Sequence, residues 1–196
     1  MGSVAPTGKH RETILTAAVS LFRRRGYSGT GLAEILSESG APKGSLYHYF
    51  PGGKTEIGAA AVSAAGGQVT RTLQALAEAH DTPEALLRAY AAQLAVWMEQ
   101  SQWRSGCPIA TVLLETAPQE DRITEAGAEA FSDWARVFED AMIRSGVTPE
   151  QARNFARLAI ATIEGSLILS RVEKSSAPIL SSAEVVAGLI ASARQD

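Results

Sequence analysis

The sequence predicts an all-α protein of about nine helices, in which a compact three-helix unit at the N-terminus precedes a larger helical domain. Apolar residues recur three and four positions apart through most of the 196 residues, which is the spacing that buries one face of a helix. Prolines fall at the joints between these segments, and no stretch alternates apolar and polar residues as a strand does. With 45% hydrophobic and 20% charged residues, the composition is that of a soluble globular protein.

Three helices are predicted in the first part of the chain. The first covers about His10–Arg25 and ends at Gly26. The second covers Thr30–Ser39, with Thr30 as its N-cap. Gly40 can adopt the positive φ that a sharp corner needs, and the third helix then covers Pro42–Phe50.

The third helix is predicted to have one inward stripe and a polar remainder. Leu46 and Phe50 stand four residues apart and can pack inward together. Two short helices joined by a tight corner and packed against a third helix are typical of a helix-turn-helix. The last helix of this motif enters the major groove of DNA. The remaining side chains are of the types that bind phosphate oxygens and base edges: Lys43, Ser45, Tyr47, His48 and Tyr49.

The rest of the chain is predicted to form six further helices. Asp81, Thr148 and Ser181 are suitable caps for three of them, and Pro149 fits the first turn after Thr148. No internal repeat is evident. The predicted ranges are about 53–79, 81–102, 108–117, 120–144, 148–173 and 181–194.

The order of residues from Arg11 to Lys54 resembles the TetR family of bacterial transcriptional regulators. The matching features include the Gly26-Tyr27 helix end, the Gly40 corner and the run Lys43–Phe50. Residues 1–8 are small and polar without a periodic pattern, and are expected to form a flexible arm. The resemblance implies a DNA-binding domain at 9–54 and an effector-binding and dimerisation domain at 55–196. It also implies that the protein contacts double-stranded operator DNA, and that Thr30 and Lys54 bind its phosphates. The implied contact residues are Thr30, Lys43, Gly44, Ser45, Tyr47, His48, Tyr49 and Lys54.

Some residues depart from the common pattern of that family. The link Pro51-Gly52-Gly53 is one residue longer than usual, and Ala33 stands where some relatives have a base-reading arginine. We therefore expect the third helix to read most of the operator. The longer link, Ala41-Pro42 in the corner and Gly106-Cys107-Pro108 resemble the LmrA/YxaF-type subgroup.

The charge distribution also favours DNA as the partner of the N-terminal part. Residues 9–54 contain seven basic and three acidic residues, a net charge of +4, whereas residues 55–196 have a net charge of −7. A polyanion is expected to bind the basic end. The run Arg23-Arg24-Arg25 has an alternative interpretation, as a solvated helix end that the helix dipole favours.

The last two helices are predicted to form a dimer interface. The segment Pro149–Glu173 mixes small and bulky residues, which allows another helix to approach closely. An inner stripe of the chain's own core is the alternative. A homodimer would supply the paired half-sites that tight specific DNA binding needs. The predicted interface residues are Phe155, Ala159, Ile163, Ser166, Leu167, Val186, Leu189 and Ile190.

The larger domain also contains a set of aromatic and sulfur-containing residues that is a candidate effector pocket. Ordinary core packing is the alternative for each of them. We expect a small, largely apolar or aromatic effector whose binding shifts the helix at 53–79 and releases a repressor from a palindromic operator. The candidate pocket residues are Trp97, Met98, Trp103, Cys107, Phe131, Trp134, Phe138, Phe155 and Glu164.

Enzymatic activity, metal binding and membrane insertion are not expected. The three histidines fit no metal-ligand spacing, no HExxH, CxxC or GxSxG motif occurs, and no cofactor is predicted. A single cysteine and the lack of a span of about 20 apolar residues favour a cytoplasmic protein, nucleoid-associated when bound to DNA. Cys107 is either a redox-active thiol or a small buried side chain. The alternative function is therefore a helical ligand-binding or thiol-based redox sensor with little specific DNA binding.

Overall fold

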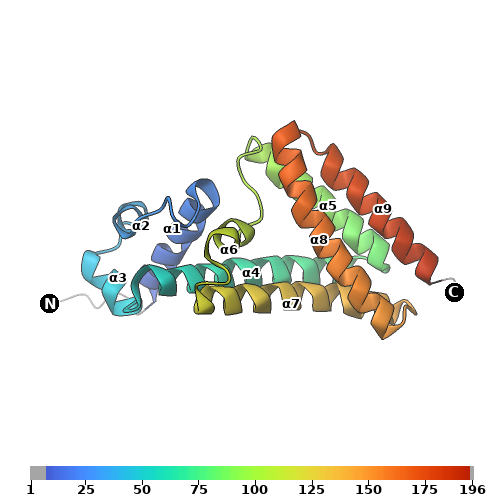
Figure 1. The fold of residues 1–196 in the computed structure, drawn as a ribbon, viewed down its shortest axis with the longest axis horizontal. Helices are drawn as coiled ribbons and strands as arrows, with labels where there is room; N and C mark the ends of the chain where they lie inside the picture. Colours follow the sequence, from blue (N-terminus) through green and yellow to red (C-terminus); the bar gives the residue numbers. More distant parts are fainter. Residues whose placement is uncertain (1–7, 195–196) are drawn as a thin grey trace. The chain divides into compact units, whose positions relative to one another are not determined.

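The structure is a computed structural model that describes residues 8–194. Within these residues the chain forms nine α-helices and no strand, which confirms the predicted fold class (Figure 1). The predicted N-terminal arm lies outside the described residues except for Gly8, which precedes the first helix. The helices are α1 (Lys9–Arg25), α2 (Leu32–Ser39), α3 (Lys43–Tyr49), α4 (Gly53–Ala79), α5 (Pro83–Gln100), α6 (Ala110–Thr116), α7 (Asp121–Arg144), α8 (Pro149–Glu173) and α9 (Ala177–Ala193).

The chain divides into two compact units. The first contains the chain up to Gly66 together with Pro108–Glu129, and the second contains Gly67–Cys107 and the chain from Ala130 onward. Helices α4 and α7 each contribute to both units. The first unit therefore combines the three predicted N-terminal helices with α6, which comes much later in the sequence.

The core of the first unit is the apolar side of α1 packed against α2, α3 and α6. Ile14 and Phe22 of α1 are fully buried, and so are Ile35 of α2 and Leu46 of α3. Phe50, which follows α3, is 1% exposed and closes the core, as its spacing from Leu46 predicts. Burial of each such side chain stabilises the fold by about 1.5–3 kcal/mol, so these contacts hold α3 against α1.

The corner before α3 follows the prediction for Gly40 but not for its neighbours. Gly40 ends α2 in the left-handed conformation, with φ of 63°. Pro42 has an extended ψ of 142° and caps α3, which begins one residue later. Gly31 rather than Thr30 caps α2, and the Glu34 carboxylate accepts a hydrogen bond from the Gly31 N–H at 2.9 Å. The predicted N-cap role of Thr30 is therefore wrong.

The second unit is built on α5, α8 and α9, which contact one another pairwise. Leu87 of α5, Ile163 of α8 and Ile190 of α9 are buried in it. Arg88 forms a two-pronged hydrogen-bonded pair with Glu184, at 2.6 and 2.7 Å, and so ties α5 to α9. In the described residues, no helix has both the length and the apolar character that crossing a membrane requires.

Two helix starts in this unit differ from the prediction. Thr82 rather than Asp81 caps α5, because its hydroxyl accepts a hydrogen bond from the Ala85 N–H at 3.2 Å. Helix α9 begins at Ala177, before the predicted start at Ser181, with Pro178 in its first turn. Proline suits a first turn because its missing N–H would be unbonded there. Pro178 is therefore the sequence signal for the observed start of α9, and Ser181 lies inside the helix.

Candidate DNA-binding interface

Helix α3 presents a polar strip that is free of core contacts. Lys43, Gly44, Tyr47 and His48 are exposed, and the Tyr47 side chain is 52% exposed. These positions are spaced as neighbours on one side of a helix, opposite the buried Leu46. Two further predicted contact residues, Ser45 and Tyr49, are half-buried at the edges of the strip.

Aromatic rings stabilise one end of this strip. The rings of His48 and Tyr49 meet edge to face with centroids 4.9 Å apart. At the base of the helix the Arg11 guanidinium lies over the Phe50 ring, 5.7 Å from its centroid. The strip can therefore present hydrogen-bonding groups to a ligand while the rings of Tyr49 and Phe50 hold its helix in place.

The other two predicted contact residues are placed differently. Thr30 is fully buried, and its hydroxyl donates a hydrogen bond to the Gly26 carbonyl at 2.9 Å. Lys54, in the first turn of α4, is half-buried with its Nζ 4.4 Å from the centroid of the Tyr27 ring. The structure therefore groups the α3 residues on one surface, places Lys54 beside Tyr27, and leaves Thr30 inside.

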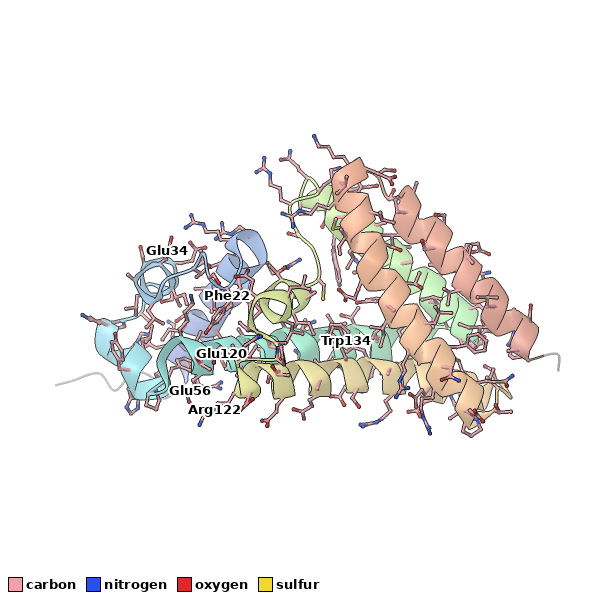
Figure 2. The ribbon with its side chains drawn as sticks, in the orientation of Figure 1. Phe22, Glu34, Glu56, Glu120, Arg122 and Trp134 are labelled. Atoms are coloured by element: carbon pink, nitrogen blue, oxygen red, sulfur yellow. The ribbon has the colours of Figure 1, made fainter. Side chains whose placement is uncertain are left out.

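Two arginines of the Arg23-Arg24-Arg25 run form ion pairs with α2. Arg24 Nη2 lies 2.8 Å from Glu38 Oε1, and Arg25 pairs with Glu34, which Figure 2 labels on α2. These exposed pairs tie the end of α1 to α2. Lys43, in contrast, makes no ion pair within residues 8–194, so its charge is available to a ligand.

The candidate pocket residues all belong to the second unit. Of the nine, Met98, Cys107, Trp134 and Phe138 are buried, whereas the other five are partly exposed. The rings of Phe131 and Trp134 meet edge to face at 5.1 Å.

Glu164 and Cys107 of this set come together, and the fold adds Tyr90 to them. The Cys107 thiol donates a hydrogen bond to Glu164. Burial raises the pKa of Glu164 above its usual range, and the thiol only partly opposes this rise. Burial also raises the pKa of Tyr90, and the nearby Cys107 and Glu164 add to the effect.

Tyr90 was not among the residues predicted to line the pocket. It lies on α5 within an otherwise apolar stripe with Leu86, Leu87 and Leu94. A hydroxyl on a helix face that is otherwise apolar was the available signal, because buried polar groups need a partner.

Most of the predicted interface residues are buried within the single chain. Ala159, Ile163, Ser166, Leu167, Val186 and Ile190 are buried, Phe155 is half-buried and Leu189 is exposed. Like Leu189, other apolar side chains of α8 and α9 are left in contact with solvent. We call Leu158, Ile168, Leu169 and Val172 of α8 together with Val185 and Leu189 of α9 the exposed α8–α9 face.

Metal binding has no candidate group in the described part of the chain, where no cluster of three or more His, Cys, Asp or Glu side chains could hold an ion. The exposed polar strip lies on α3, which packs with α2 against α1. This arrangement defines a helix-turn-helix regulator of transcription.

Comparison with known proteins identifies the family. Residues 14–61 match the family described as bacterial regulatory proteins of the tetR family, and residues 83–185 match the LmrA/YxaF-like C-terminal domain of transcriptional regulators. The HTH-type transcriptional regulator LmrA of Bacillus subtilis is 36% identical over 173 residues, which cover 88% of this chain and 92% of LmrA. The chain belongs to the TetR family of transcriptional regulators, with an LmrA/YxaF-like C-terminal domain.

Solved structures share the fold. The regulatory protein TetR from Rhodobacter sphaeroides has a TM-score of 0.79 at 24% identity, over 91% of this chain and 97% of that one. A cysteine mutant of the TetR-family regulator CifR, solved with 26 bp double-strand operator DNA, has a TM-score of 0.75 at 19% identity, over 90% and 95% of the two chains.

Proposed function

We propose that this TetR-family regulator is a repressor that binds a palindromic operator as a homodimer and is released by a small effector. The observation that carries the proposal is the exposed strip of Lys43, Gly44, Tyr47 and His48 on α3. Its lysine suits a phosphate, and the tyrosine hydroxyl and the imidazole suit base edges in the major groove. The solved complex of CifR with operator DNA supports DNA as the ligand.

The dimer in this proposal forms through the exposed α8–α9 face. A two-fold axis pairs the same patch from both copies, so an apolar face becomes buried against itself. Val172 and Val185 are 77% and 66% exposed in the single chain, and burying such side chains is favourable. Two recognition helices per assembly would explain a palindromic operator, because each would read one half-site.

The effector in this proposal binds in the second unit. Aromatic walls and the polar group of Tyr90, Cys107 and Glu164 would suit a largely apolar or aromatic molecule with one polar end. A half-buried acid and a buried phenol in one helical bundle are the kind of groups that orient a ligand. Helix α4, which runs through both units, would transmit the change. An effector can do so only by preferring one state of the protein.

A thiol-based redox sensor is the weaker alternative. The neighbours of Cys107 in the second unit include Glu164 and Tyr90, which are both acids. Acids do not stabilise a thiolate, whereas reactive cysteines lie next to cationic groups or helix N-termini. These two acidic neighbours favour ligand recognition over sensing.

The experiment that tests DNA recognition begins with selection of bound fragments from genomic DNA by the purified protein. Affinities for the selected operator and for competitor DNA are then measured for Lys43→Ala, Tyr47→Ala and Lys54→Ala at several salt concentrations. Loss of Tyr47 should weaken operator binding by about 1–3 kcal/mol, whereas loss of Lys54 should weaken binding to all sequences and reduce the salt slope by about 1.

Lys174→Ala is the matched control, because Lys174 is an exposed lysine at the end of α8 in the second unit. It should leave operator binding unchanged. Wild-type affinity in all three test variants would contradict the proposed interface. An effector that binds the protein without changing operator affinity would contradict the proposed release.

A further inference from the structure

The turn between α1 and α2 holds the carboxylate of a residue that is distant in sequence. Glu115 of α6 accepts a hydrogen bond from the Tyr27 N–H at 3.0 Å and another from the Ser28 N–H at 2.7 Å. Each N–H uses a different oxygen, so both oxygens of the carboxylate are engaged. Helix α6 contacts α1 within the same unit, as Figure 1 shows. We call this arrangement the Glu115 clamp.

The backbone next to the clamp is shaped to admit the carboxylate. Gly26 has a φ of 78°, a conformation that side chains other than glycine rarely adopt. A Cβ at this position would lie 2.1 Å from Glu115 Oε1, so any larger residue would displace the carboxylate. Two successive N–H groups that converge on one anion are a recognised means of holding a carboxylate. The conformation of Gly26 therefore leaves the space that the Glu115 carboxylate occupies at the turn.

The same turn is held from a second side through Tyr27. The Lys54 ammonium lies over its ring, and its hydroxyl forms a hydrogen bond with Thr55. Thr55 Oγ1 in turn donates to Glu120 Oε2 at 3.3 Å; Glu120, which Figure 2 labels, directly precedes α7. The segment from Glu115 to Glu120 thus contacts the turn and the start of α4 together.

The position of this turn matters because the chain passes directly from it into α2 and then α3. We propose that Glu115 is a positioning residue for operator binding, which holds the α1–α2 turn to α6 and so fixes the orientation in which α3 meets DNA. This inference rests on the proposed function of α3. It assigns to α6 a part in DNA recognition without any contact to DNA.

The pKa of Glu115 supports an engaged carboxylate. Glu115 is an exposed residue, and the slight burial of its carboxylate would raise this pKa. The N–H and hydroxyl of Ser28, the N–H of Tyr27 and the nearby Lys54 outweigh burial and hold the pKa below its usual range. The ionised form is therefore the one that the turn stabilises.

The direction of the change in operator affinity distinguishes the proposed positioning role from a general charge effect. Removing a negative charge from the DNA-binding unit should strengthen binding to a polyanion. Loosening the turn should weaken specific binding, because the protein must then order the turn when it binds. Glu115→Gln removes the charge and leaves only one acceptor for two N–H groups. Glu125→Gln is the matched control, since Glu125 is an exposed acid on α7 in the same unit.

The experiment compares the full-length wild type, Glu115→Gln and Glu125→Gln in binding to the selected operator and to competitor DNA, with amide hydrogen exchange at Tyr27 and Ser28. We expect Glu115→Gln to bind the operator about tenfold more weakly than the control, to bind competitor DNA as the control does, and to exchange both amides faster. Glu115→Asp keeps the charge and both oxygens, and should give an intermediate loss.

Operator binding by Glu115→Gln that equals or exceeds that of Glu125→Gln would overturn the inference, as would unchanged exchange at the two amides. If Glu115→Gln does not fold, wild-type operator affinity in Glu115→Asp with faster exchange at these amides would overturn it too. A wild-type chain without sequence preference would overturn the proposed function and this inference with it. A wild-type preference that Glu115→Gln retains in full would overturn this inference alone.

Discussion

Glu164 combines a mostly buried carboxyl group with a neighbouring thiol and phenol, and the described residues form no ion pair with it. An acid whose pKa is raised in the folded state binds its proton more tightly there than in the unfolded chain. It therefore favours folding at low pH, and this advantage is lost as pH rises through and above the usual carboxyl range. A side chain kept at a cost to stability is typical of a functional site.

We predict that Glu164→Gln raises the free energy of unfolding relative to the wild type. The difference should grow as pH is raised from about 4 to about 8, because the glutamine needs no proton to remain neutral. Denaturant unfolding across this range at fixed protein concentration measures it. Glu173→Gln, an exposed change on the same helix, should show no such growth. A difference that shrinks with rising pH would contradict the assignment of Glu164 as a buried acid.

At the scale of elements, close approach between α4 and its neighbours depends on Gly58. A Cβ there would lie 2.8 Å from Ile123 Cδ1 of α7 and 2.9 Å from Cε2 of Tyr27. Tyr27 also carries the Glu115 clamp, so Gly58 permits the packing that supports the α1–α2 turn.

We predict that Gly58→Ala destabilises the protein by about 1–3 kcal/mol through overpacking, despite the better helix propensity of alanine. Gly67→Ala is the control in the same helix, since only the end of the flexible Arg71 side chain lies near, at 3.6 Å. It should stabilise the protein by about 0.5–1 kcal/mol. Thermal and denaturant unfolding measure both. Equal effects at the two glycines would refute the packing argument.

At the scale of the whole molecule, the proposed dimer would bury the exposed α8–α9 face between two copies of the chain. We predict that Val185→Asp converts the dimer to a monomer, because the two-fold axis places a charge from each copy in one apolar interface. Operator affinity should fall when dimerisation is lost, because one recognition helix alone has few contacts to DNA.

Sedimentation analysis over a range of protein concentrations tests this prediction. Val96→Asp is its control, because Val96 on α5 is also exposed, at 44%, but lies outside the α8–α9 face. A dimer that persists in Val185→Asp at the wild-type dissociation constant would rule out this face as the interface.

The sequence predicted the helices well because helix signals are local. The Gly40 corner and the Thr148 cap both depend on residues a few positions apart, and the structure confirms both. The errors at the starts of α2, α5 and α9 arose where two suitable caps lay close together. Thr30 and Asp81 were predicted as caps, whereas their neighbours Gly31 and Thr82 cap the two helices through hydrogen bonds to residues three positions away.

The site was predicted in part for the same reason. The α3 strip follows from the spacing of Leu46 and Phe50, which determines which residues of that helix remain outside. The role of Glu115 could not be predicted, because its hydrogen bonds to Tyr27 and Ser28 cross 88 and 87 positions of sequence. Tyr90 was missed because its partners lie on other elements.

The sequence by itself determined the helical fold, the helix-turn-helix and the family, since periodicity, caps and a contiguous motif are all readable along the chain. Only the tertiary structure decided which side of α8 and α9 is covered, that Thr30 is inside, and that α6 holds the turn before the recognition helix. An amphipathic pattern shows that a helix has an apolar side, but a helix that is apolar on two sides can bury either one. Packing between distant segments makes that choice.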